Sequence, residues 1–128
     1  MAKPRIRNCF LAFMLLAGPA WSADTVTPKE LGRQLDAGEA PLILDVRTEA
    51  EYLDGHVPGA RLIPHDRIGE YMDSLSQHRQ DPVVVYCHSG GRTEKAIREL
   101  EQAGFSRVIE LEGSFQAWKR SEQPVEVP

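Results

Sequence analysis

The residues best suited to do chemistry lie in a six-residue loop, Cys87-His88-Ser89-Gly90-Gly91-Arg92. Two adjacent glycines permit positive φ angles, so a short loop can curl and point successive backbone N–H groups at one place. Cysteine reacts as the thiolate, and a positive environment lowers its pKa below the usual value of about 8.5. We therefore expect Cys87 to be a nucleophile held in an anion-binding loop.

Charges around this loop should favour the thiolate. Arg92 adds a permanent positive charge at the far end of the loop, and His88 can add a partial one. A helix that follows the loop would also point its positive N-terminal end toward Cys87. In the alternative interpretation Cys87 is an inert apolar residue, which leaves the glycines and Arg92 without a common cause. The substrate-binding residues that we expect are His88, Ser89, Gly90, Gly91 and Arg92.

Other polar residues are weaker candidates for the site. His56 and His65 could act as a general base, although a histidine in a turn is more often a structural hydrogen-bonding residue. Asp45 and Arg47 end a buried strand and could touch the site. For these two residues we favour an internal ion pair that braces the loops.

A strand and a helix must position the loop. Pro82 to Tyr86 contains three β-branched residues in a row and leads directly into Cys87. Residues 93–103 are expected to form the following helix, with Gly104 just beyond its end. Further helices are expected at 27–38, 48–54, 67–77 and 114–120, and further strands at 41–46, 61–64 and 108–111.

This alternation of elements sets the fold class. Strands that are apolar on both faces and alternate with helices predict an α/β fold, with a parallel sheet between helical layers. In such sheets the ligand site lies beyond the carboxyl ends of the strands. Cys87 occupies one of these positions.

The N-terminal segment has the pattern of a secretory signal peptide. A basic start precedes an unbroken apolar run at 9–17, which is too short to span a bilayer, and small residues follow. We expect residues 1–22 to be removed by cleavage after Ser22, with Ala20 and Ala23 as alternative positions. An N-terminal helix that is amphipathic or buried in the fold is the other interpretation.

Removal of this segment changes the net charge and the number of cysteines. The 128-residue chain has a formal net charge of −4, and the segment takes away basic residues only, so the charge argues against nucleic acid and anionic lipid as partners. Cys9 also leaves, and Cys87 becomes the single thiol. An internal disulfide or a cysteine-based metal site is then excluded. Residues 24–128 are expected to form one domain.

Three parts of the sequence match a known pattern. They are DVRTEAEY at 45–52 with GHVPGA at 55–60 and Ile63-Pro64, the loop CHSGGRT at 87–93, and Ala117-Trp118 with Pro124. Together they resemble the rhodanese family, and the resemblance covers about residues 27–124. It implies a single rhodanese-like domain with a five-stranded, mainly parallel sheet flanked by helices on both faces, like the small periplasmic thiosulfate sulfurtransferases of bacteria. One departure is Gly113-Ser114, where the family usually has two glycines.

The resemblance also implies a reaction. The Cys87 thiolate would take a sulfur atom from a donor such as thiosulfate, carry it as a persulfide and pass it to an acceptor. Cyanide would be the acceptor in an assay, and a small or protein thiol would be the acceptor in the cell. The resemblance implies no metal and no organic cofactor, and a periplasmic location with no membrane contact after cleavage.

Two other functions stay open beside sulfur transfer. In cysteine-dependent phosphatases and arsenate reductases, the active-site loop resembles a cysteine and an arginine separated by five residues. Only four residues separate Cys87 from Arg92. The tighter ring suits a persulfide better than a tetrahedral phosphate. The other alternative is a persulfide-carrying or sulfur-sensing module that binds a partner, although non-catalytic modules of this family usually lack the cysteine.

Overall fold

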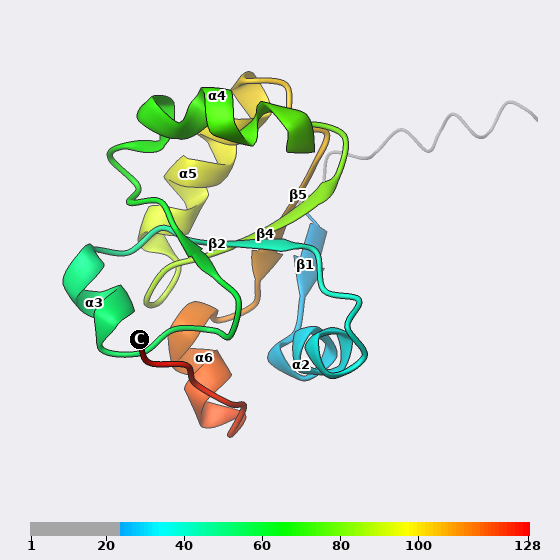
Figure 1. Cartoon of the computed structure of the whole chain (residues 1–128), viewed down its shortest axis with the longest axis vertical. Coiled ribbons are helices and arrows are strands. Elements are labelled where there is room, and N and C mark those ends of the chain that lie inside the picture. Colours follow the sequence, from blue (N-terminus) through cyan, green and yellow to red (C-terminus); the bar gives the residue numbers. More distant parts are fainter. Residues whose placement is uncertain (1–23) are drawn as a thin grey trace, which may run out of the picture.

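The chain is built on one sheet of five strands, in the order β1-β5-β4-β2-β3. The computed structural model describes residues 24–128, so the predicted signal peptide lies outside the described residues. Every pairing between neighbouring strands is parallel, which confirms the predicted α/β fold (Figure 1). The strands are β1 (Asp24–Val26), β2 (Leu42–Asp45), β3 (Arg61–Leu62), β4 (Pro82–Tyr86) and β5 (Arg107–Leu111).

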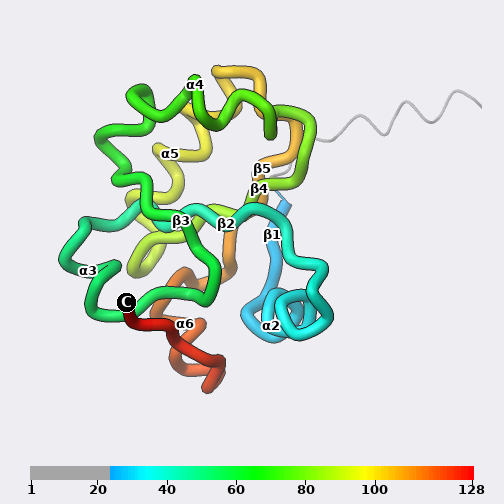
Figure 2. Tube along the Cα trace, in the orientation of Figure 1, coloured from blue at the N-terminus to red at the C-terminus, as the bar shows by residue number. Residues whose placement is uncertain are grey.

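Helices cover both faces of this sheet. Figures 1 and 2 show α4 and α5 on one side and α2 and α6 on the other, while α3 lies at the end of the sheet. No helix of the described part is long and apolar enough to cross a membrane. The helices are α2 (Pro28–Asp36), α3 (Glu49–Leu53), α4 (Met72–Leu75), α5 (Gly91–Gln102) and α6 (Ser114–Arg120), with 3-10 turns η1 (Ile68–Tyr71) and η2 (Ser76–His78) on either side of α4.

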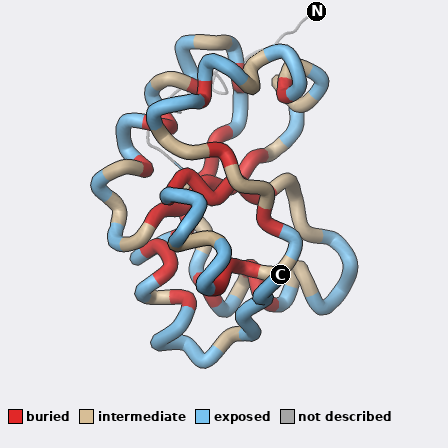
Figure 3. The backbone as a smooth tube through the Cα atoms, turned by 60° about the vertical axis from the view of Figure 1, so that its left-hand side comes forward, coloured by how far each residue is buried: buried red, intermediate tan, exposed pale blue. Residues whose placement is uncertain are grey.

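The central strands supply two separate cores, because successive side chains of a strand point to opposite faces. Val83 and Val85 of β4 belong to the core beneath α4 and α5. Val84 and Tyr86 belong to the core that contains Trp118 of α6. Figure 3 shows many of the buried residues in the middle of the molecule. Burial on both faces explains why the β4 sequence reads as a continuous apolar run.

The predicted helix starts are confirmed where threonine precedes the helix. Thr27 accepts a hydrogen bond from the backbone N–H of Glu30 at 3.1 Å. Thr48 and Glu51 form a complete capping box at the start of α3, in which each side chain bonds the backbone N–H of the other residue. This box fixes the position of Glu51 beside the loop that carries Cys87.

Three expectations about the elements were wrong in detail. Strand β1 was not predicted, because it has three residues at the sheet edge and little burial. The single helix expected at 67–77 is three short pieces, in keeping with the weak helix propensity of Gly69. Helix α5 begins at Gly91 instead of Thr93, because Gly90 with φ +126° turns the chain directly into it.

Candidate active site

Cys87 lies directly after β4, at the carboxyl edge of the sheet, as the sequence predicted. Cys87 is a free cysteine and is only 1% exposed. The backbone N–H of Gly90 donates a hydrogen bond to Cys87 Sγ at 3.0 Å. The positive φ of Gly90 directs this N–H inward. Gly91 lacks a positive φ, and a Cβ there would meet nothing within 4 Å, so only one glycine of the pair is required by the backbone.

The pKa of the Cys87 thiol lies below its ordinary value. Burial alone raises this pKa, but the hydroxyl and backbone N–H of Thr93, the N–H of Gly90 and the hydroxyl of Ser114 lower it. The Thr93 hydroxyl is buried without a hydrogen-bond partner, so its hydrogen is available to the sulfur. The direction is the predicted one, but the main cause differs. Hydrogen bonds to the sulfur, more than the charge of Arg92, favour the thiolate.

Arg92 is held in an ion pair that the sequence did not suggest. Its Nη1 and Nη2 atoms donate to the two carboxylate oxygens of Glu51 at 2.8 and 3.1 Å. These bonds are the largest cause of the lowered pKa of Glu51, which is about 2. The Arg92 side chain remains 29% exposed. Because a guanidinium has five N–H donors, Arg92 keeps donors for an anion while it contacts Glu51.

Two other loop residues predicted to bind substrate lie at the surface. Ser89 is exposed, and His88 is partly buried beside a cavity of about 210 Å³. Arg47 and Lys119 lie over the Phe115 ring at this cavity, at 4.3 and 5.2 Å from its centroid. The cavity wall therefore carries these two cations together with the carboxylates of Glu51 and Asp54. The cavity is lined by Arg47, Glu51, Asp54, Gly55, His88, Phe115, Lys119 and Val125.

The start of α6 packs against the loop through hydrogen bonds. The backbone N–H groups of Phe115 and Gln116 donate to the carbonyls of Cys87 and His88 at 3.0 and 3.1 Å. The Ser114 hydroxyl accepts from the Cys87 backbone N–H at 3.2 Å and lies 3.9 Å from Sγ. Helix α6 therefore fixes the backbone of the nucleophile.

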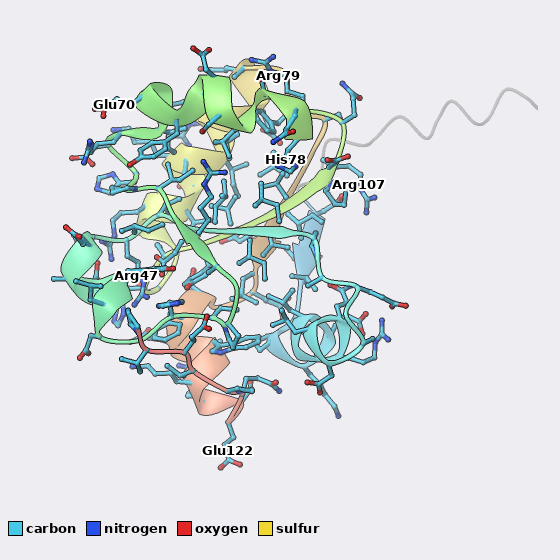
Figure 4. All side chains as sticks on the ribbon, viewed as in Figure 1. Arg47, Glu70, His78, Arg79, Arg107 and Glu122 are labelled. Carbon is cyan, nitrogen blue, oxygen red and sulfur yellow. The ribbon has the colours of Figure 1, made fainter. Side chains whose placement is uncertain are left out.

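Asp45 and Arg47 form the internal brace that we favoured. Arg47 Nε and Nη2 donate to the Asp45 carboxylate at 2.9 and 2.7 Å, and Nη2 also donates to the Gly55 carbonyl at 2.8 Å. The Tyr86 hydroxyl donates to Asp45 at 2.7 Å and accepts from the Val57 N–H at 3.0 Å. All of these groups are buried, and Figure 4 shows Arg47 beside α3. The network joins β2, β4 and the segment after α3.

The two histidines considered as general bases serve other contacts. His56 Nδ1 lies 2.9 Å from the Tyr52 carbonyl, and its ring stacks on the Tyr52 ring. The backbone of His56 pairs with that of Glu126. His65 Nδ1 is buried without a hydrogen-bond partner. Within residues 24–128, neither histidine is hydrogen-bonded to Cys87, so the geometry gives no support to the general-base role.

Sequence reasoning missed three residues of the site: Thr93, Ser114 and Glu51. Thr93 follows the loop directly and could have been found from its place in the first turn of α5. Ser114 was visible only as a serine at a usual glycine position. Glu51 caps the start of α3, and nothing in its local sequence connects it with Arg92, which is 41 residues away. Residues 24–128 also contain no group of His, Cys, Asp and Glu side chains that could hold a metal ion.

Chemically, the arrangement suits covalent catalysis by the cysteine. A thiolate with several donors aimed at it is a ready nucleophile, and the same donors can stabilise an anion formed on the sulfur. Thiols need no metal for this chemistry. The site can therefore accept an electrophilic atom on Cys87 and release it to a second nucleophile.

Comparisons with known proteins agree on one family. A family model described as a rhodanese-like domain matches residues 27–121. A sulfurtransferase of Allochromatium vinosum is 35% identical over 103 residues, which cover 80% of this chain and 94% of that protein. The probable adenylyltransferase/sulfurtransferase MoeZ of Mycobacterium tuberculosis is 38% identical over 110 residues, and this chain covers 84% of its own length but only 28% of MoeZ.

Solved structures agree with the sequence comparisons. The crystal structure of a rhodanese-like domain protein from Staphylococcus aureus superimposes with a TM-score of 0.71 at 30% identity. The match covers 82% of this chain and 98% of that one. Both relatives named above are called sulfurtransferases.

Proposed function

This chain belongs to the rhodanese-like domain family, and from this premise we propose that it is a thiosulfate sulfurtransferase that works through a persulfide on Cys87. The observation that carries the proposal is the hydrogen bond of 3.0 Å from the Gly90 N–H to Cys87 Sγ. A buried thiol that receives N–H donors and has a lowered pKa is prepared to act as an anion.

The reaction has two steps that balance in atoms and charge. The Cys87 thiolate attacks the outer sulfur of thiosulfate, a new sulfur–sulfur bond forms, and the bond to the inner sulfur breaks. Sulfite leaves with that electron pair, and Cys87 carries a persulfide anion. An acceptor such as cyanide or a thiolate then attacks the terminal sulfur, and Cys87 leaves as the thiolate. The donors around Sγ suit both steps, because each begins or ends with negative charge there.

We assign to Arg92 the role of binding the dianionic donor. Its exposed fraction of 29% and its unused N–H groups let it contact the sulfonate end while it stays paired with Glu51. Lys119 is a further cation at the cavity beside His88, whereas the charge of Arg47 there is matched by Asp45. This arrangement favours a small anion as the donor.

The acceptor and the location complete the proposal. We propose that the acceptor in the cell is a small or protein thiol, and that the chain acts in the periplasm after loss of residues 1–22. A persulfide carrier that hands sulfur to one specific partner uses the same Cys87 chemistry and differs only in its acceptor. Turnover with free thiols separates the two, because a dedicated carrier would accept sulfur from thiosulfate but release it slowly to small thiols.

The test is to measure the intact mass of the reduced protein before and after incubation with thiosulfate. We expect a gain of one sulfur atom, which disappears when cyanide is added and thiocyanate forms. The chain offers a matched control, because it has two cysteines. In the uncleaved chain, which still carries Cys9, Cys9→Ala should keep both events and Cys87→Ser should lose both, since a serine hydroxyl stays protonated in this pH range. Unchanged mass in the wild type, or thiocyanate formation in Cys87→Ser, would refute the proposal.

A further inference from the structure

Ser114 has an unusual backbone conformation for a residue with a side chain. Its φ is +54°, and only Glu122 shares a positive φ among the non-glycine residues that the structure describes. Ser114 is also completely buried. Such a conformation is strained for any residue except glycine, and strain of this kind persists where the surrounding structure enforces it, often at functional sites.

The contacts of Ser114 converge on the nucleophile. Its hydroxyl oxygen accepts a hydrogen bond from the Cys87 backbone N–H at 3.2 Å and lies 3.9 Å from Cys87 Sγ. A hydroxyl has one hydrogen to donate. Because the oxygen is occupied by the Cys87 N–H, that hydrogen can point toward Sγ. The distance of 3.9 Å makes this a weak bond that gains strength when the sulfur is negative.

The surroundings hold the hydroxyl in this place. Gly113, with φ +74°, leads into Ser114, and a Cβ at Gly113 would collide with Ala117. The next two amides of α6, from Phe115 and Gln116, bond the carbonyls of Cys87 and His88. The serine is therefore fixed against the loop from both sides along the chain. Glycine would relieve the strain, but it would remove the buried acceptor of the Cys87 N–H.

We propose that Ser114 is a positioning residue that orients Cys87 and stabilises its sulfur as an anion, both before attack on the donor and when the thiolate leaves the persulfide. The proposal rests on the proposed function only in taking Cys87 as the nucleophile. It assigns a role to the hydroxyl at a position where a smaller residue would suit the backbone better. The lowering of the Cys87 pKa by Ser114 agrees with it.

The test compares Ser114→Ala, Ser114→Gly and the wild type. Alanine keeps the Cβ and the strain and removes only the hydroxyl, whereas glycine removes both. Ser121→Ala is the control, because Ser121 is exposed at the other end of α6. The rate of alkylation of the peptide that contains Cys87 is followed by mass spectrometry across a range of pH. The midpoint of this profile reports the thiol pKa and is independent of Cys9.

We expect both Ser114 variants to raise the midpoint by about 0.5 to 1 unit, which corresponds to the loss of one weak hydrogen bond to the thiolate. Ser121→Ala should match the wild type. The midpoint is more decisive than a single rate, because a thiolate of higher pKa is also more nucleophilic. Ser114→Gly keeps the test valid if the alanine variant does not fold.

Two results would overturn the proposal. Midpoints equal to that of the wild type in both variants, with only the unfolding temperature changed, would make Ser114 a structural residue. A raised midpoint in Ser114→Gly alone would assign the effect to the backbone instead of the hydroxyl, because Ser114→Ala has also lost the hydroxyl. Alkylation requires no sulfur donor, so a wild type that forms no persulfide would refute the proposed function without altering this result.

Discussion

Replacing Glu51 by glutamine should weaken the protein in a way that depends on pH. Glutamine keeps the size of the side chain and an oxygen that can accept the capping bond from Thr48, but it removes the charge that holds Arg92. The pKa of Glu51 is about 2, against an ordinary value of 4.5, and the bonds from Arg92 are its largest cause. That difference corresponds to about 3.4 kcal/mol before any correction for solvent.

Solvent reduces this figure. The Glu51 and Arg92 side chains are 32% and 29% exposed, and ion pairs near the surface contribute much less than buried ones. We expect Glu51→Gln to lower the free energy of unfolding by about 1 to 2 kcal/mol at neutral pH. Part of the pKa shift comes from hydrogen bonds with Thr48. In the variant these bonds remain, but only as neutral hydrogen bonds.

The sign of the pH dependence follows from the lowered pKa. A carboxylate whose folded pKa lies below its unfolded pKa stabilises the fold above the unfolded value, and the contribution disappears as the pH falls through the folded value. The gap between wild type and Glu51→Gln should therefore narrow from about pH 4.5 toward about pH 2. Urea denaturation at a series of pH values measures it. Glu49→Gln is the control, an exposed neighbour in the first turn of α3. A gap that stays constant with pH would refute the electrostatic origin.

Two more predictions concern the site, and a third concerns the N-terminal segment. Arg92→Ala should reduce thiosulfate turnover at low substrate about ten- to a hundredfold, and unchanged turnover would make Arg92 purely structural. In the Arg92→Ala background, Glu51→Gln should lower the free energy of unfolding little further. Hydrolysis of an aryl phosphate should be negligible beside thiocyanate formation from thiosulfate and cyanide under the same conditions, because the ring from Cys87 to Arg92 is short; a better rate with the phosphate ester would contradict this. The mature protein should begin at Ala23 in the periplasmic fraction, and a cytoplasmic product that still carries Met1 would contradict export.

The part of the fold around Cys87 could be predicted because its signals are local. Three β-branched residues before the cysteine indicate a buried strand, the glycines indicate a turn, and Ala96, Ile97 and Leu100 indicate one face of a helix. Each signal falls within a few residues of the element that it predicts. The strand, the loop and the helix then place the cysteine at the carboxyl edge of the sheet without any knowledge of distant contacts.

The remaining features depend on contacts between distant residues. Glu51 and Arg92 are 41 positions apart, and Ser114 and Cys87 are 27 apart. Neither pair has a periodicity or spacing that marks it. Strand β1 exists because β5 offers a free edge for it to join, and its own exposed sequence carries little signal. Tertiary structure decides such elements, so propensity alone does not find them.

Hydrogen-bond donors near the sulfur, more than nearby charge, explain how the Cys87 thiolate is stabilised. Arg92 is the cation that the sequence placed there, yet its charge is largely matched by Glu51 at 2.8 Å. The groups that lower the Cys87 pKa most are hydrogen-bond donors on Thr93, Gly90 and Ser114, all close to the sulfur. Salt screens exposed charges over distances of about 8 to 10 Å but hardly affects buried hydrogen bonds. The reactivity of the thiol should thus depend on the exact positions of these donors and little on ionic strength, while salt should act mainly on the binding of an anionic donor at Arg92.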